Sequence, residues 1–144
     1  MNKMLEIINC NVSIDELSPA SLAYVGDACF EIYVRSKITL EENRKIKDLN
    51  KEAMKYVKAS MQAESYKDIE SFLTEEELEI YKRGRNHKGS ISSKSATVAD
   101  YRMATGLECL IGYLFLKNEN DRLNELMKII FDKKDERKNM NEEQ

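Results

Sequence analysis

The sequence contains few residues that interrupt helices. Pro19 is the only proline among 144 residues, and there are five glycines. Proline lacks a backbone N–H and glycine is costly to order, so both are frequent in turns and scarce inside helices. This scarcity favours long helices over many short strands. We therefore predict an all-α fold.

Cysteine and long apolar runs are also scarce, which excludes several classes of protein. The three cysteines are odd in number and scattered, and no pair has metal-ligand spacing. The longest apolar run, residues 109–116, is far shorter than the roughly 20 residues of a membrane-spanning helix. The N-terminus contains Glu6 and does not resemble a signal peptide. We expect a cytoplasmic protein without membrane contact, in which Cys29 and Cys109 are small core residues.

The composition fits one globular domain. Hydrophobic residues make up 42% and charged residues 34%, which is typical of a folded chain with a heavily charged surface. A length of 144 residues is sufficient for one domain with a hydrophobic core but short for two independently folded domains. We predict a single domain over residues 1–144, with its core at about 17–131 and a charged, frayed C-terminal tail at about 132–144.

The charged residues are distributed unevenly. The net charge of −3 by itself argues against nucleic-acid binding. However, residues 82–99 contain five basic side chains and no acid, whereas acids concentrate at 75–79 and in the tail. A basic loop on an acidic body is compatible with a polyanionic partner, and a solvated loop is an equally good interpretation. A second basic set is better interpreted as a solvated helix face: Lys45, Lys47, Lys51, Lys55 and Lys58.

Capping residues and apolar spacing predict where the helices lie. Ser18 before Pro19 is a helix-start signal, and Thr74 with Glu77 and Thr97 with Asp100 have the pattern of capping boxes. Residues 83–95 are polar and lack apolar periodicity, which predicts a loop. The predicted helices cover about 19–38, 44–66, 74–81 and 97–116, and a last amphipathic helix carries Leu123, Leu126, Met127, Ile130 and Phe131.

Two carboxylates lie in apolar surroundings. Asp27 is the only charged residue in 22–30, and Glu108 is the only one in 103–116. Both helices are apolar around most of their circumference there, so we expect both acids to approach the interior. An ionised carboxylate is costly to bury unless it is paired or binds a metal.

Glycines next to both acids predict that the two helices touch. Gly26 precedes Asp27, and Gly106 and Gly112 flank Glu108. A glycine inside a helix costs about 1 kcal/mol relative to alanine, so it needs a packing reason. The simplest reason is a close helix crossing near Gly26 and Gly112, which would bring the two acids together. A hard divalent cation with oxygen ligands would relieve their repulsion.

Other interpretations of the polar residues stay open. Each acid could instead form a structural ion pair, for which Arg35 and Arg102 are available. Glu31 and Arg35 are one helical turn apart and are most simply a surface salt bridge. The single histidine, His87, lies in the polar loop, a weak place for the base of a Ser-His or Cys-His system. No glycine loop that binds phosphate and no dinucleotide fingerprint occurs.

The motifs around the two acids resemble those of the Mini-ribonuclease III family. Residues 22–28, Leu-Ala-Tyr-Val-Gly-Asp-Ala, resemble the ribonuclease III signature. Residues 105–116, Thr-Gly-Leu-Glu-Cys-Leu-Ile-Gly-Tyr-Leu-Phe-Leu, resemble the second motif of the family. Residues 83–86 resemble the loop of this family. Residues 56–63 resemble the helix that lies between the two motifs. The order and spacing of the motifs are specific, and the resemblance extends from about 17 to 131.

The resemblance implies a helical ribonuclease III-type endonuclease domain that forms a homodimer. It implies Mg²⁺-dependent cleavage of double-stranded RNA, leaving 5′-phosphate and 3′-hydroxyl ends, in the maturation of 23S large-subunit ribosomal RNA in bacteria. Mn²⁺ could take the place of Mg²⁺, and a large-subunit ribosomal protein could assist. Asp27 and Glu108 match the catalytic, metal-binding acids of the family. The candidates for contacts with RNA phosphates are Lys82, Arg83, Arg85, Asn86, His87, Lys88 and Lys94.

The sequence departs from full-length ribonuclease III in ways that agree with the Mini-ribonuclease III branch. Thr105 replaces the acid three residues before Glu108, Ala20 and Ala23 replace upstream glutamates, and we expect no double-stranded RNA-binding domain. These changes leave fewer metal ligands.

Two alternatives to a nuclease are a module of the same fold that binds RNA without cutting it and a helical scaffold with structural acids. Retention of both carboxylates favours the nuclease. The dimer surface stays undecided, because a face such as Leu22, Val25 and Cys29 could equally be core of one chain.

Overall fold

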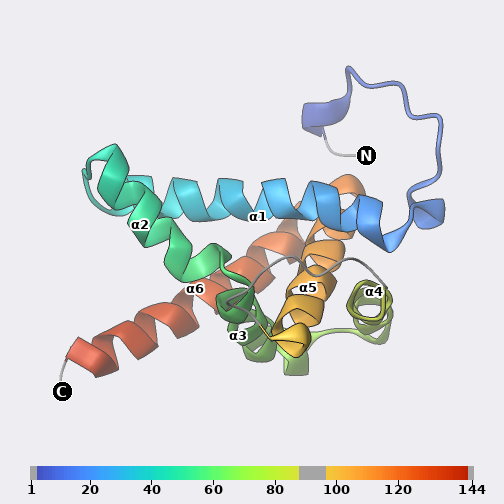
Figure 1. The fold of residues 1–144 in the computed structure, drawn as a ribbon. Coiled ribbons are helices and arrows are strands. Elements are labelled where there is room, and N and C mark those ends of the chain that lie inside the picture. Colours follow the sequence, from blue (N-terminus) through green and yellow to red (C-terminus); the bar gives the residue numbers. More distant parts are fainter. Residues whose placement is uncertain (1–2, 88–96, 143–144) are drawn as a thin grey trace.

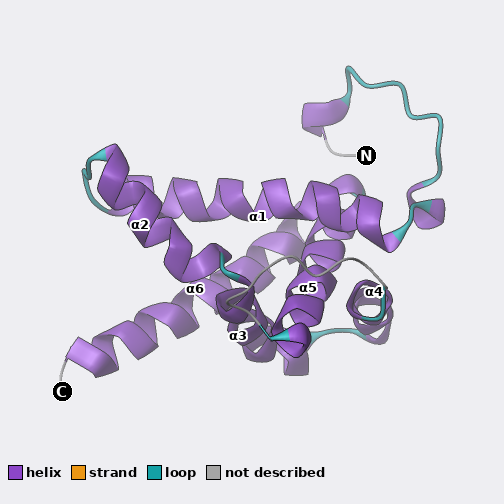
Figure 2. Cartoon of the chain, viewed as in Figure 1, coloured by secondary structure: helices purple, strands orange, loops and turns teal. Residues whose placement is uncertain are grey.

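Helices form all the regular secondary structure in the described part of the chain. The computed structural model describes residues 3–87 and 97–142 (Figure 1), and Figure 2 shows only helices and loops there. The all-α prediction is confirmed. None of the described helices is long and apolar enough to cross a membrane. The elements are η1 (Lys3–Leu5), η2 (Ile14–Glu16), α1 (Pro19–Glu41), α2 (Ile46–Val57), α3 (Ala59–Ile69), η3 (Glu70–Phe72), α4 (Glu75–Arg85), α5 (Val98–Leu116) and α6 (Asn120–Glu142).

Side-chain caps start three of these helices at the predicted residues. The Ser18 hydroxyl accepts a hydrogen bond from the Ser21 N–H at 3.1 Å. Thr74 and Glu77 form a reciprocal capping box, and Thr97 caps α5 through its hydroxyl. Each cap satisfies backbone donors that have no partner within the first turn.

The helix predicted over 44–66 is two helices. Lys58 lies between α2 and α3 with an extended backbone (φ −60°, ψ 146°), so the chain turns there. Apolar spacing alone did not reveal the break, because the buried positions Tyr56, Ala63 and Tyr66 continue on both sides of it.

The helix predicted to end at Tyr81 continues to Arg85, so residues 83–85 are helical and not part of a loop. Gly84 suggested a loop residue, but a Cβ there would lie 2.6 Å from the Cβ of Cys109. This glycine therefore serves close packing of α4 on α5.

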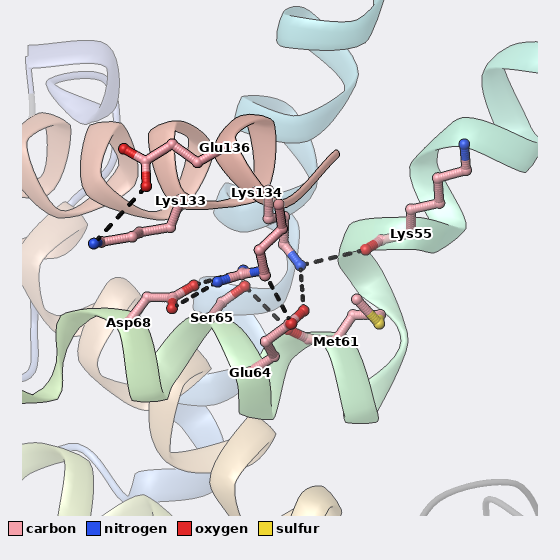
Figure 3. A network of polar contacts seen from close by, with 9 residues as sticks. Lys55, Met61, Glu64, Ser65, Asp68, Lys133, Lys134 and Glu136 are labelled. Atoms are coloured by element: carbon pink, nitrogen blue, oxygen red, sulfur yellow. Dashed lines mark hydrogen bonds and ion pairs between the residues drawn. The ribbon is translucent and has the colours of Figure 1, made fainter. Parts of the chain in front are cut away.

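The charged C-terminal tail, predicted to fray, is the helical end of α6. Lys134 is buried, and its ammonium lies 3.4 Å from both the Glu64 carboxylate and the Lys55 carbonyl (Figure 3). The Arg137 guanidinium donates to both carboxylate oxygens of Asp68, at 2.9 and 2.8 Å. Such two-point ion pairs are among the stronger polar contacts. Polar contacts with α3 and α2, not an apolar stripe, hold this part of α6.

α5 is the central element of the core. It packs against α1, α3, α4 and α6, as Figure 1 shows. Cys109 is fully buried on α5, and Leu22 and Cys29 of α1 are buried against the same core. Of the face Leu22, Val25 and Cys29, which could equally have been a dimer surface, Leu22 and Cys29 therefore belong to the core of one chain, whereas Val25 is only half-buried and lines a groove on α1.

α1 and α5 cross with their backbones in direct contact. A Cβ at Gly26 would lie 1.7 Å from the Glu108 carbonyl oxygen, and one at Gly112 would lie 2.0 Å from the Leu22 carbonyl oxygen. No side chain fits at either position, so the predicted crossing near Gly26 and Gly112 is confirmed. Gly106 serves a different contact, since a Cβ there would lie 2.4 Å from the ring of Tyr81 on α4.

Replacing Gly26 or Gly112 by alanine should separate the two helices. The obstructing atoms are backbone and cannot rotate away, so we expect a loss of about 3 kcal/mol in unfolding free energy, the upper end of the usual cost of overpacking. Chemical denaturation measures this loss. Ser36→Ala, at an exposed position of α1, is the control and should change little. Equal stability of Gly26→Ala and Ser36→Ala would contradict the close crossing.

Candidate active site

The glycine crossing places Asp27 and Glu108 beside each other at the junction of α1 and α5. Glu108 is half-buried, and Asp27 is exposed. The expectation that both acids approach the interior is therefore wrong for Asp27. Gly26 is the residue that faces α5, and the next residue points about 100° further around the helix, towards the rim of the crossing.

The two carboxyl groups interact directly. Burial, the hydrogen bond with Asp27 and the charge of Asp27 together raise the pKa of Glu108 to about 9. At neutral pH Glu108 therefore keeps its proton and shares it with Asp27 in a hydrogen bond. In residues 3–87 and 97–142, no lysine or arginine forms an ion pair with either acid. The alternative of two structural ion pairs is thus wrong for these residues, and Arg35 pairs with Glu31 at 2.9 Å, as predicted.

Two further residues of the site did not stand out in the sequence. Gln62 on α3 is buried, with 3% of its surface exposed, and its hydrogen bond to Glu108 favours the ionised carboxylate. Glu31 adds negative charge that raises the pKa of Glu108. Helical spacing contained both signals: Glu31 is four residues after Asp27, and Gln62 shares a face with the buried Tyr66.

The donor set of the site suits a hard cation. Among the described residues no group of three or more His, Cys, Asp or Glu side chains has the arrangement of a metal site. Mg²⁺ is usually held by only one or two carboxylates, with water and substrate phosphates as its other ligands. The pair of Asp27 and Glu108 meets that requirement. Thr105 does not replace the charge of the missing acid, because its side chain is neutral, and its hydroxyl donates to the Tyr101 carbonyl at 3.0 Å.

The last turn of α4 brings basic side chains next to α5. Gly84 packs against Cys109, the neighbour of Glu108 in sequence. Arg83 donates to the Leu17 carbonyl at 3.4 Å. Arg85 lies with its guanidinium carbon 5.8 Å from the centre of the Tyr81 ring. Positive charge is also favourable here because the C-terminal end of a helix carries partial negative charge.

The other candidates for RNA contact differ in position. Lys82 is half-buried on α4, and Asn86 and His87 are exposed just after it. Lys88 and Lys94 lie outside the described residues.

The family of the chain follows from comparison with known proteins. Residues 20–119 match the model of the ribonuclease III domain. A Mini-ribonuclease 3 of Clostridium tetani is 44% identical over 119 residues, which cover 81% of this chain and 78% of that protein. A Mini-ribonuclease 3 of a Thermoanaerobacter species is 47% identical over 113 residues, covering 78% of this chain and 80% of the relative.

A solved structure supports the same assignment. The crystal structure of a Fusobacterium nucleatum protein superposes with a TM-score of 0.75 at 34% identity, covering 84% of this chain and 97% of that one. Fold, motifs and identity over most of the length agree. The chain belongs to the Mini-ribonuclease III branch of the ribonuclease III family, and it is an endoribonuclease.

Proposed function

We propose that the protein is a Mg²⁺-dependent endonuclease for double-stranded RNA that matures the ends of 23S large-subunit ribosomal RNA in the cytoplasm. The observation that carries the proposal is the carboxyl pair of Asp27 and Glu108. The pair lies where α1 and α5 cross in backbone contact at Gly26 and Gly112, and it has no lysine or arginine partner among the described residues. Membership of the ribonuclease III family supports the choice of RNA as substrate.

Asp27 and Glu108 would hold the divalent ion, directly or through water. Mg²⁺, or Mn²⁺ in its place, would supply charge stabilisation at the phosphate and acidify a water molecule. The Gln62 hydrogen bond favours ionised Glu108 and fixes its orientation. Such support from residues behind the ligands commonly tunes metal sites.

The basic end of α4 would bind the substrate backbone. Double-stranded RNA is recognised mainly by shape and through phosphates and 2′-hydroxyls. Arg83 and Arg85 therefore need no base contacts, and Lys82, Asn86, His87, Lys88 and Lys94 would add to the same surface.

A homodimer would supply one carboxyl pair for each RNA strand. The exposed face of α1 supports a second copy as the occupant, because Tyr24 is 83% and Ile32 62% exposed, with exposed Ala28 between them on the same stripe. A groove of about 810 Å³ runs along this stripe and is also lined by Asp27. A sedimentation mass of a single chain would contradict the dimer.

Two rival functions make different predictions. An RNA-binding module without activity would bind duplex RNA but leave it intact with any metal. For a helical scaffold, Mg²⁺ or Mn²⁺ would not change the melting temperature in a way that depends on Asp27, so Asp27→Asn would respond like the parent.

A large-subunit ribosomal protein could be needed for cutting, so precursor RNA with and without ribosomal protein is the second substrate to test.

Asp27→Asn and Glu108→Gln should each abolish cutting of a long RNA duplex. Losing several kcal/mol of charge stabilisation corresponds to a rate loss of roughly 100-fold or more. Gel analysis of the products measures it, with EDTA as a second way to stop the reaction. Asp121→Asn, an exposed acid on α6, is the matched control and should cut like the parent. Cutting that survives in Asp27→Asn would remove Asp27 from the site.

In EDTA, Glu108→Gln should be more stable than the parent at alkaline pH. The unfolded chain releases the Glu108 proton near pH 4.5, but the folded chain keeps it to about pH 9. The contribution of Glu108 to stability is therefore fully present below pH 4.5 and is lost as the pH rises towards 9. Glutamine cannot ionise, so its advantage should grow across this window. Melting temperatures at several pH values test this, and a pH-independent difference would contradict the shared proton.

Replacing Arg83 and Arg85 by glutamine should raise the KM for duplex RNA and flatten the salt dependence of binding. The affinity falls as the salt concentration rises, and each lost phosphate contact makes the slope of log affinity against log salt less steep by about one. Lys128→Gln with Lys133→Gln on α6, both exposed, removes the same charge elsewhere. An unchanged slope in the arginine variant would show that α4 does not bind phosphate.

A further inference from the structure

The exposed side of α2 carries a row of lysines, which we call the lysine face: Lys47, Lys51, Lys55 and Lys58. Lys47, Lys51 and Lys55 are four positions apart on α2 and therefore lie on successive turns of one side, and Lys58 follows directly after the last residue of the helix. The opposite side of α2 contributes Tyr56, which is 6% exposed, to the core.

Most of this charge is not neutralised by nearby acids. Lys55 pairs with Glu52 at 3.0 Å. Lys47, Lys51 and Lys58 form no ion pair with any acid of the ranges 3–87 and 97–142. The first turn of α3, which follows Lys58 directly, contains no acid either. In a chain of net charge −3, this is a local concentration of positive charge.

The lysine face borders a hollow where α2 meets α3. The hollow has a volume of about 460 Å³ and is lined by Lys51, Lys55 and Lys58 together with Met54 and Met61. The extended backbone of Lys58 creates this corner. Three lysine side chains therefore line one concave surface, and two of them, Lys51 and Lys58, form no ion pair among the described residues.

The row begins close to the carboxyl pair. Lys58 precedes α3, and its carbonyl accepts a hydrogen bond from the Gln62 N–H at 2.9 Å, so its backbone lies one turn from the residue whose side chain bonds to Glu108. From Lys58 the row leads away along α2 to Lys47, over roughly 16 Å at 1.5 Å per residue. Figure 1 shows α2 and α3 on one side of α5 and α4 on the other. The carboxyl pair thus has positive charge on both sides.

We propose that the lysine face is a second contact surface for the phosphate backbone of duplex RNA, which grips the duplex beyond the cut site. The proposal rests on the proposed function. Lysine is a flexible point charge suited to phosphates rather than to reading bases, so the contact should be independent of sequence.

Duplex length should separate this surface from the basic end of α4. A short duplex of roughly 10 base pairs centred on the carboxyl pair would not extend along α2, whereas one of roughly 30 base pairs would. The lysine face should therefore contribute only to the long duplex.

The test measures fluorescence anisotropy of both duplexes with the full chain in EDTA, over a range of salt concentrations. The variant is Lys47→Gln with Lys51→Gln, which removes two charges that have no ion-pair partner among the described residues, at the end of the row farther from the carboxyl pair. Lys128→Gln with Lys133→Gln removes the same charge from α6 and is the control. We expect the variant to bind the long duplex at least several-fold more weakly. Its slope of log affinity against log salt should be less steep by about two. The short duplex and the control should be unaffected.

The outcomes distinguish the two proposals. A parent that binds and cuts long duplex, with equal affinity and slope in the lysine variant, would overturn the lysine face and leave the proposed function standing. Equal weakening on short and long duplexes would also overturn it, because the lysines would then act through general charge. A parent that neither binds nor cuts duplex RNA would overturn the proposed function and the lysine face together.

Discussion

The backbone contact between α1 and α5 is the constraint on which the rest of the site depends. Gly26 and Gly112 remove the two side chains that would keep the helices apart. Asp27 follows Gly26 on α1, and Gly26 packs against the Glu108 carbonyl on α5, so the two acids lie within hydrogen-bonding reach. Two acids would not adopt this arrangement by themselves, since their charges repel. Packing energy of the helices therefore maintains an electrostatically unfavourable pair.

That unfavourable pair explains the chemistry of its surroundings. Without a cation, one shared proton relieves the repulsion, and burial raises the pKa of Glu108 further. Gln62 acts in the opposite direction by favouring the charged form. A divalent ion that bound here would have to displace this proton, so its affinity would rise with pH. Positive charge on α4 and on the lysine face lies to either side, where a polyanionic substrate would lie.

Much of the framework could be predicted from residues close in sequence. Ser18, Thr74 and Thr97 marked the helix starts because a cap acts within one turn. The α1–α5 crossing was also predictable, because a glycine inside an apolar helix signals close packing. The break at Lys58 was not, since the same buried spacing continues through α2 and α3.

The sequence by itself determined the helical class, the caps and the approach of Asp27 to Glu108, because these depend on local spacing and on residue size. Only the tertiary structure decided that Gln62 reaches Glu108, that Asp27 is exposed, and that the end of α6 is bound through Arg137 to Asp68. Such contacts join helices far apart in the chain. A charged or polar residue looks the same in sequence whether it faces solvent or a partner, and only the packing of the helices distinguishes the two.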